Sequence, residues 1–515
     1  MNSGAILTAL LLGVLIAVVA AWLIGGLYRR RMLALMRLTP NTPAARGATT
    51  PGTQTPSQPR TPLPGAHRLH RAMRRQMLAL TGVGLLIGLT HAALALALLY
   101  GEGLLTPGRW LTLGLVYAWP LVLTWGLLWR WSWTRTWLAV GVYLLVMLLL
   151  VRWRSVEPLS LGSSAGWLAG LVALPAVVSL LIGASGRIRA IAPYLLPIGL
   201  LWSAGTLAVQ LWQLDGLGSP PAWLLWLVGV LGAWPSIVLL AVLPWLVLAW
   251  PAWWLARVLA QAYQAQRFSD LGFLVAAYWA VVLSASALPS LQGSGWVGLV
   301  TLLPWLWLPL MQWAMRAWLR PQGTPATLLV LRVFQQDAAV QVLFDRVIER
   351  WRLVGRTVLI AGTDLLSRTI DPDDVFTFLN GRLNERFIGD AEQLWRREDA
   401  MRTDPDPDGR YRVEECYCHD NTWQLALNAL VGRADIVLMD LRGFQAHNQG
   451  CRHELTVLAA AGHLQRVVVL VDGHTDRATA EADAVSAPAG RFVWVTCERL
   501  DERGVRVVVA ALAGE

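Results

Sequence analysis

Apolar residues divide the chain into two regions by their spacing. Over the first 320 residues, apolar runs recur that can each cross roughly 30 Å of hydrocarbon. The runs are Ala5–Tyr28, Leu78–Tyr100, Trp110–Leu128, Leu138–Val151, Trp167–Ile182, Ile191–Trp212, Trp223–Ala249, Leu271–Leu291 and Trp296–Trp313. Residues 1–320 are therefore predicted to form a membrane domain of about nine transmembrane helices.

After Pro321 the pattern changes to short β-rich runs that alternate with amphipathic helices. Strands are expected at Thr327–Phe334, Thr357–Ala361, Asp435–Leu441, Arg466–Asp472 and Phe492–Thr496, with a terminal strand at Val505–Ala510. Helices are expected at Ala338–Val354, Asn421–Gly432 and Cys451–Gly462. Val, Ile and Leu runs joined by helices are typical of a parallel sheet covered on both faces. Residues 321–515 are thus expected to form an α/β parallel-sheet domain, with ligand loops at the carboxyl ends of its strands.

Charge is distributed unevenly between the two regions. Residues 1–320 hold 21 arginines and four acidic residues, a net charge of +17, whereas residues 321–515 carry −7. The basic residues of the first region lie at helix ends, where they set topology and contact membrane lipid, so nucleic-acid binding is not expected. All 43 basic residues are arginine, which excludes a lysine Schiff base and a phosphate loop that relies on lysine.

The arginines also predict how the chain crosses the membrane. They cluster on one side of the expected spans, so we expect a multi-pass protein of the cell inner membrane, with the N-terminus outside and residues 321–515 cytoplasmic. The first run ends at Arg29–Arg31 without a small-residue cleavage site, which favours a retained helix over a signal peptide. Residues 39–67 are rich in Pro and Thr and are expected to form a disordered linker.

Two further residue types limit the chemistry. His91 is the only ionisable side chain well inside an expected span, and an interhelical hydrogen bond explains it better than a proton relay. Ion-coupled transport is therefore disfavoured. The four cysteines all lie after residue 320, where a cytoplasmic location would keep them reduced, so no disulfides are expected.

The order of motifs in residues 321–515 resembles that of a Toll/interleukin-receptor (TIR) domain. A strand, a helix and a second strand are followed by the hydrophobic strand of Ala434–Asp440, a polar loop and the helix start Gly450–Leu455, which reads G-C-R-H-E-L. This start resembles the W-C-x-x-E-L type of TIR domains, although Gly450 replaces the tryptophan. The resemblance implies a flavodoxin-like or TIR-like sheet that follows a multi-span α-helical membrane domain.

The resemblance also implies a catalytic candidate. In enzymatic TIR domains the glutamate of this motif acts in cleaving the nicotinamide–ribose bond of NAD, and the matching residue here is Glu454. A carboxylate there could hydrogen-bond ribose hydroxyls and stabilise an oxocarbenium-like transition state. The alternative is that Glu454, in the first turn of its helix, only interacts with the helix dipole.

Other candidate residues lie at the same edge of the expected sheet. Phe334 ends the first strand, and Arg442 and Phe444 follow the third, so these three are the candidate cofactor-binding residues. Arg442 could hold a phosphate or carboxylate, or could form a salt bridge to Asp440 or Glu454.

An insertion at residues 364–420 departs from the TIR pattern. It contains an expected helix at Pro372–Phe387, the turn Asp404–Gly409 and the segment Glu414–Asp420. Cys416, Cys418 and His419 could join Cys451 or His453 around zinc. They lack the paired spacing of zinc sites, however, so a strand edge with alternating side chains is expected and no metal is assigned. The aspartates of the turn lack the spacing of a calcium loop.

These expectations support a membrane-anchored signalling or effector protein whose cytoplasmic domain binds NAD or a related nucleotide. NAD glycohydrolase activity is the enzymatic hypothesis, and self-association through the cytoplasmic domain is a further expectation. No bound cofactor is assigned. The alternatives are a catalytically silent nucleotide sensor or interaction scaffold, a non-ion-coupled transporter with a regulatory domain, and a nucleoside deoxyribosyltransferase-like enzyme, which product analysis would distinguish.

Overall fold

The chain folds into two compact units, each described by itself. The computed structural model describes residues 3–37, 61–100, 106–155, 160–183, 186–211, 221–333, 341–362, 371–419 and 421–515. The first unit comprises Met1–Gly26, Leu80–Met311 and Asp371–Asp373, and the second comprises Leu27–Ala79, Gln312–Ile370 and Asp374–Glu515.

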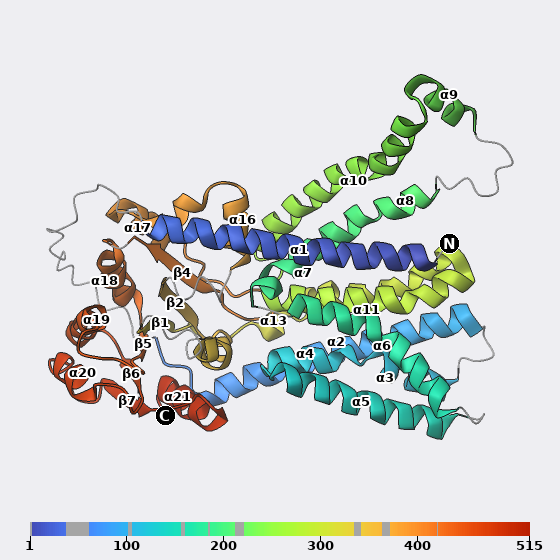
Figure 1. The fold of residues 1–515 in the computed structure, drawn as a ribbon. Helices are drawn as coiled ribbons and strands as arrows, with labels where there is room; N and C mark the ends of the chain where they lie inside the picture. Colours follow the sequence, from blue (N-terminus) through green and yellow to red (C-terminus); the bar gives the residue numbers. More distant parts are fainter. Residues whose placement is uncertain are drawn as a thin grey trace. The chain divides into compact units, whose positions relative to one another are not determined.

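The first unit is helical (Figure 1). Its helices, of which α1, α2 and α12 extend into the second unit, are α1 (Ser3–Met36), α2 (Ala66–Tyr100), α3 (Pro107–Tyr117), α4 (Pro120–Leu128), α5 (Trp133–Arg154), α6 (Leu161–Gly183), α7 (Gly186–Ser203), α8 (Gly205–Leu211), α9 (Ala222–Leu231), α10 (Ala233–Gln264), α11 (Asp270–Ser294), η2 (Gly295–Leu306) and α12 (Trp307–Ala314). The prediction of a helical, apolar first region is confirmed.

The number of membrane-crossing helices differs from the number of apolar runs in the sequence. Among the described residues, seven helices are long and apolar enough to cross a membrane, or eight if α3 and α4, which meet at 45°, form one bent span. The helix is interrupted at Ala118 and Trp119, and α4 begins at Pro120. Because proline lacks the N–H that an unbroken helix requires, a bend at this point is expected.

The last apolar segment, Asp270–Ala314, is 45 residues long but folds back on itself. The Trp305 indole N–H donates to the Ala276 carbonyl at 3.0 Å, whereas a straight helix would separate these residues by about 43 Å. The chain reverses at Gly295, whose φ is +60°, and a Cβ at Gly298 would lie 2.6 Å from the Leu291 nitrogen. Counting this hairpin as two crossings and α3–α4 as one gives nine crossings over the described residues. The number in a membrane stays a prediction.

His91 is fully buried inside the first unit. Its Nδ1 lies 2.9 Å from the Thr301 carbonyl oxygen on η2, and its ring meets that of Tyr117 edge-on at 4.5 Å. The expected interhelical hydrogen bond is therefore confirmed.

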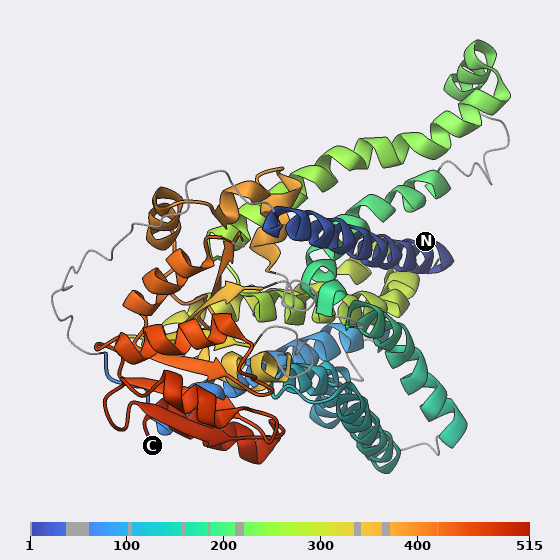
Figure 2. The ribbon, with the colours of Figure 1, turned by 60° about the vertical axis from the view of Figure 1, so that its left-hand side comes forward.

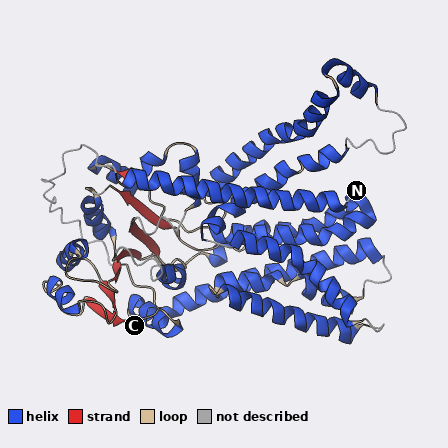
Figure 3. Cartoon of the chain, viewed as in Figure 1, coloured by secondary structure: helices blue, strands red, loops and turns tan. Residues whose placement is uncertain are grey.

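The second unit is built on a parallel sheet of seven strands, drawn in red in Figure 3. The strand order is β3-β4-β2-β1-β5-β6-β7, and every neighbouring pair is parallel. The strands are β1 (Thr327–Arg332), β2 (Arg356–Ala361), β3 (Phe387–Ile388), β4 (Val413–Cys418), β5 (Ile436–Asp440), β6 (Arg466–Val471) and β7 (Phe492–Thr496). The predicted parallel sheet is confirmed, and five of the expected strands, now β1, β2, β5, β6 and β7, have bounds within two residues of those expected.

Helices cover both faces of this sheet, as Figure 2 also shows. The core on one face joins alternate strand residues such as Leu329 and Val437 to buried residues of α18 and α19. On the other face α21 packs against β6, β7 and η3. The helical elements of this unit are α13 (Arg316–Leu319), η3 (Phe344–Ile348), α15 (Glu349–Trp351), α16 (Pro372–Leu379), η5 (Leu383–Arg386), α17 (Ala391–Asp399), α18 (Trp423–Arg433), α19 (Gln449–Ala460), α20 (Arg477–Asp483) and α21 (Glu502–Ala513).

Two expectations about individual elements are wrong. The terminal segment Val505–Ala510 is part of helix α21, not a strand, because its valines recur with helical spacing and Asp501 caps the helix by accepting from Gly504 N–H. The helix expected at Pro372–Phe387 ends at Leu379, before Gly381 with φ +72°. The insertion also adds two strands to the sheet, β3, which was not expected, and β4.

Candidate functional site

The sheet reverses its direction of growth between β1 and β5. From β1 the chain proceeds to β2 on one side, whereas β5 leads to β6 and β7 on the other. Arg332 and Asp440 are the last residues of these two strands and are register partners. Because the loops that follow diverge, this is the point at which open parallel sheets form a ligand crevice.

Arg442 is fixed by an ion pair at this edge. Its Nε donates to Asp440 Oδ1 at 2.8 Å, and both side chains are almost fully buried. Of the alternatives from the sequence, the salt bridge to Asp440 is therefore present, and phosphate binding by Arg442 stays a prediction. Leaving the arginine buried without its carboxylate would strongly destabilise the fold. The ion pair therefore holds Arg442, at the start of the loop after β5, in place against the last residue of that strand.

Asp472 joins this loop to the one after β6. Its Oδ1 accepts from the Gly443 N–H at 3.0 Å and from the Thr475 hydroxyl at 2.8 Å. Burial alone would raise the pKa of Asp472, but these hydrogen bonds favour the carboxylate and the pKa is lowered. Gly443 has φ +72°, a conformation that suits glycine and allows its N–H to point at Asp472.

The two aromatic candidates have different outcomes. Phe444 is fully buried in the core beneath α18 and α19, so its ring does not line the edge of the sheet. Phe334 lies outside the described residues, and its proposed contact with a cofactor stays a prediction.

Glu454 lies below the same edge, on α19. This helix begins at Gln449, so Glu454 is in the second turn, and the expectation that it lies in the first turn next to the dipole is wrong. The side chain is 4% exposed, and its Oε2 has no hydrogen-bond partner among the described residues. One turn earlier, the Cys451 thiol is 4.0 Å from the Arg332 carbonyl oxygen, which places α19 against the end of β1.

Burial controls the charge state of Glu454. It raises the pKa of this carboxyl to about 8, and the positive charge of Arg332 opposes the shift. Burial and the negative charge of Glu454 also raise the pKa of the Cys451 thiol. A buried carboxyl without a full set of partners is costly, and such groups concentrate at functional sites.

The residues considered for metal binding do not converge. Cys416 and Cys418 point from β4 into the hydrophobic core, while His419 Nδ1 lies 3.0 Å from the Leu35 carbonyl oxygen. In the described part of the chain, no three His, Cys, Asp or Glu residues are placed to hold a metal ion. The expected strand with alternating side chains is confirmed as β4, but its expected position at an edge is wrong, because β4 pairs with both β2 and β3.

The aspartates of residues 404–409 are engaged by arginines. Asp406 accepts from Arg412 Nε at 3.0 Å, and Asp408 accepts from Arg410 Nε at 2.9 Å. A hydrogen bond from Gly409 N–H to the Asp406 carbonyl closes the turn. The predicted turn is therefore confirmed.

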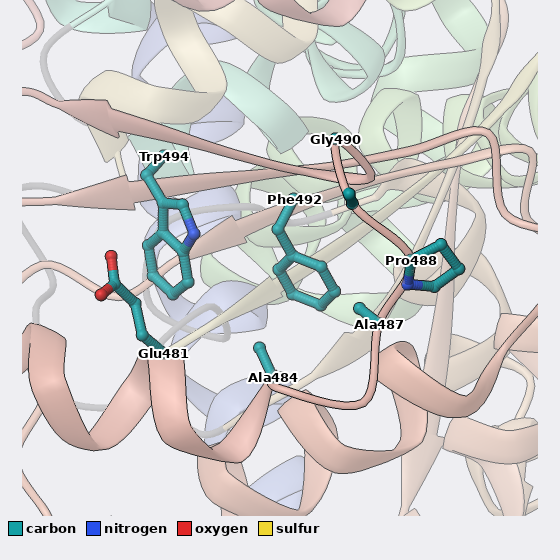
Figure 4. Close-up of a pocket in the computed structure, with 8 residues that line it drawn as sticks. Glu481, Ala484, Ala487, Pro488, Gly490, Phe492 and Trp494 are labelled. Carbon is teal, nitrogen blue, oxygen red and sulfur yellow. The ribbon is translucent and has the colours of Figure 1, made fainter.

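A small cavity of about 180 Å³ lies at the outer strand β7. Figure 4 shows the rings of Phe492 and Trp494 directed at α20, with Ala484 and Glu481 facing them. Its lining includes none of the residues of the β1–β5 edge. Arg477 lies over Trp494 and also pairs with Glu481.

Sequence reasoning missed two groups of polar residues. Arg332 and Asp472 end or follow strands at the ligand edge, and this position alone could have identified them. Asp374, Glu415 and Tyr417 form a buried cluster within the insertion. Only the alternation of β4, which places Glu415 and Tyr417 on one face, could have hinted at that cluster.

Comparisons of this chain with protein-family models, with curated proteins and with solved structures find no significant match.

Proposed function

We propose that this chain is a multi-pass membrane protein of signalling or effector type, whose cytoplasmic, TIR-like sheet domain binds NAD or a related nucleotide and cleaves the nicotinamide–ribose bond. The observation that carries the proposal is Glu454, a buried carboxyl with an unpartnered oxygen among the described residues, on the helix whose Cys451 contacts the end of β1.

The strand order supports a nucleotide site. With the two strands of the insertion set aside, the remaining order is β2-β1-β5-β6-β7, which is the order of flavodoxin-like doubly wound sheets. In such sheets the ligand lies at the switch point, here between β1 and β5. Arg332 and the Asp440–Arg442 pair provide charge and hydrogen-bonding groups at that point.

The charge state of Glu454 suits a cationic ligand. A pKa of about 8 means that ionising this carboxyl in the resting protein costs about 5 kcal/mol more than in water. A positive charge placed beside it lowers that cost, and both the nicotinamide ring of NAD and an oxocarbenium-like ribose are positive. Glu454 would therefore be ionised mainly when substrate is bound. It would favour the transition state because the positive charge moves from the nicotinamide ring to C1′ of the ribose, beside the carboxylate.

The bond changes are those of a glycoside hydrolysis. The ribose C1′–N bond breaks with its electron pair retained by nicotinamide, which becomes neutral. Water then adds to C1′ and loses a proton to solvent. In this reaction the Glu454 carboxylate would accept hydrogen bonds from ribose hydroxyls and offset the positive charge at C1′.

The proposal is tested by nicotinamide release from NAD by the full chain in lipid vesicles at high surface density. Wild type should release nicotinamide, and Glu454→Gln should lose at least about 100-fold in rate, because the amide keeps the size of the side chain but cannot carry the charge. Glu481→Gln, at an exposed glutamate on α20, is the matched control and should retain activity. Activity of Glu454→Gln equal to wild type would refute the catalytic role.

The silent sensor is the second candidate, and the near-complete burial of Glu454 favours it. A carboxyl that solvent barely reaches could serve only to fix α19 against β1 until a nucleotide binds. Saturable NAD binding by the wild-type chain with no nicotinamide release would select this function over hydrolysis.

A further inference from the structure

Strand β7 is the outermost strand at one end of the sheet, and among the described strands it pairs only with β6. Its sequence, F-V-W-V-T over Phe492–Thr496, contains no charged residue and no proline. Proteins commonly protect an exposed strand edge with such residues, or keep the edge strand short. The strand at the opposite end of the sheet, β3, has two residues, whereas β7 has five. β7 is therefore the unprotected edge of this sheet.

The pairing with β6 determines which backbone groups of β7 face outward. The Cys497 N–H, directly after the strand, donates to the Val471 carbonyl oxygen of β6 at 2.8 Å. In a parallel ladder the bonds alternate along each strand, so every second residue before Cys497 also faces β6. The N–H and C=O groups of Phe492, Trp494 and Thr496 face away from β6, and no other segment of the described chain forms a hydrogen bond with them.

The three outward residues are symmetric about Trp494. When a second β7 lies antiparallel with its own Trp494 opposite this one, Phe492 of each copy lies opposite Thr496 of the other. All three are then hydrogen-bonded pairs, in which the two residues exchange both N–H···O bonds. A register shifted by two residues would leave Phe492 or Thr496 of each copy beyond the end of the partner strand. The centred register alone satisfies every outward N–H and C=O of both strands.

The side chains of β7 suit the same arrangement. Phe492 and Trp494 project from one side of the strand, with ring centroids 6.2 Å apart, and both are only partly buried (Figure 4). Antiparallel pairing centred on Trp494 brings the two indole rings next to each other on that side of the joined sheet. Cross-strand aromatic pairs of this kind stabilise a sheet, and the second strand would shield these rings from water.

The charges beside β7 favour an antiparallel partner. Arg491 precedes the strand and Glu498 follows it closely. Arg491 donates to backbone carbonyls such as that of Ala461, and Glu498 accepts from the Gly473 N–H, so neither forms an ion pair in the described chain. Antiparallel pairing brings Arg491 of one copy to the end that holds Glu498 of the other, whereas parallel pairing would bring like charges together.

The partner that best fits this edge is a second copy of the chain. Five residues of strand edge bury less than the roughly 800 Å² per partner of a standard interface, so a partner from solution would bind weakly. Copies anchored in one bilayer have a high effective concentration, which allows a small interface to form. Each copy also carries the uncharged, self-complementary strand that the edge requires.

We propose that two copies of this chain pair through β7, antiparallel and centred on Trp494, so that their sheets join into one continuous sheet. The pairing uses neither Glu454 nor the β1–β5 edge. It therefore stands or falls independently of the proposed hydrolysis.

Cysteine cross-linking of the full chain tests the register. Phe492→Cys and Thr496→Cys are placed in separately tagged copies, co-expressed in one membrane and treated with a mild oxidant; the native cysteines are buried. The two positions face each other at a Cα–Cα distance of about 5.5 Å, which a disulfide spans. Like positions lie about 13 Å apart along the strands.

A mixed disulfide should therefore form at least about tenfold more efficiently than either variant forms with itself. Equal yields, or no mixed disulfide, would overturn the proposal. A wild-type chain that stays monomeric at high density in vesicles would leave the edge to solvent or to another partner, and would overturn it as well.

A proline variant tests the backbone bonds. Thr496→Pro removes an outward N–H from each copy but no bond to β6, a position at which an edge strand tolerates proline. It should weaken association at least about tenfold in single-molecule counting of copies per vesicle, whereas Thr496→Ser, which keeps the N–H, should match wild type. Hydrogen exchange of the β6 amides reports whether the sheet is intact. Association of an intact Thr496→Pro chain equal to wild type would refute pairing through β7, and if β6 lost its protection, the mixed disulfide would decide the question alone.

Discussion

Glu454→Gln should remove much of the pH dependence of the sheet domain's stability. The pKa of Glu454 is raised to about 8 in the folded chain, against 4.5 when exposed. Between these values the folded state holds a proton that the unfolded state has released, so the free energy of unfolding falls as pH rises. The full shift corresponds to about 5 kcal/mol, of which about 3 kcal/mol falls between pH 5 and pH 8.

The assay is global hydrogen exchange of the core amides of β1, β5 and β6 in the full chain at a series of pH values. Wild type should lose stability relative to Glu454→Gln as pH rises, with a difference that grows by about 3 kcal/mol from pH 5 to pH 8. Titration of the other groups is common to both chains and cancels in this difference. The control variant Glu481→Gln should track wild type. Parallel curves for wild type and Glu454→Gln would show that Glu454 ionises normally and would refute the reasoning.

The remaining predictions concern the ion pair, a glycine and the topology. Asp440→Ala should lower the free energy of unfolding by about 3–5 kcal/mol because it leaves Arg442 buried without its carboxylate, and adding Arg442→Met should recover part of that loss in denaturant unfolding. Gly409→Ala should lower the melting temperature, since φ is +84° and the new Cβ would lie 2.3 Å from the Leu319 carbonyl oxygen; unchanged melting would contradict this close approach. A reporter fused after Glu515 should read cytoplasmic, and a periplasmic signal would overturn the orientation.

Much of the fold could be predicted because the strands are nearly continuous apolar runs. Such runs form the buried centre of the sheet, and segments like Arg466–Val471 therefore appear in the sequence as they do in the structure. The strand order could not be derived, because it depends on contacts distant in sequence. The bounds of β4 do not follow from an apolar run, because one face of this strand carries the buried polar residues Glu415 and Tyr417, which contact each other only in the folded chain.

The segment Val505–Ala510 shows that an apolar pattern alone does not distinguish a strand from a helix. Residues Val505–Ala510 are β-branched and apolar and favour a strand by propensity. In the structure Val505 and Val508 are buried at helical spacing. Asp501 is the N-cap of the helix, and its side chain accepts a hydrogen bond from the Gly504 N–H. Packing against the sheet therefore overrides the local preference of these valines.

The location of the candidate site could be predicted from the sequence, but the hydrogen-bond and ion-pair partners of its residues could not. The motif located Glu454 on a helix after β5, and the strand ends located Arg442. The partners of these residues could not be read from the sequence, because the ion pair to Asp440 and the unpartnered oxygen of Glu454 depend on side-chain packing. The domain boundary was also incomplete, since Leu27–Ala79 belongs to the same compact unit as the sheet.

The most direct test of the central claim is the infrared absorption of the protonated Glu454 carboxyl, identified by its loss in Glu454→Gln. At neutral pH the wild-type chain should show this band, because the pKa of about 8 keeps the carboxyl mostly protonated. Saturating NAD should reduce the band, since the positive nicotinamide ring favours the carboxylate. A band that remains unchanged while NAD binds, or NAD that does not bind, would contradict the assignment of a nucleotide site to the β1–β5 edge.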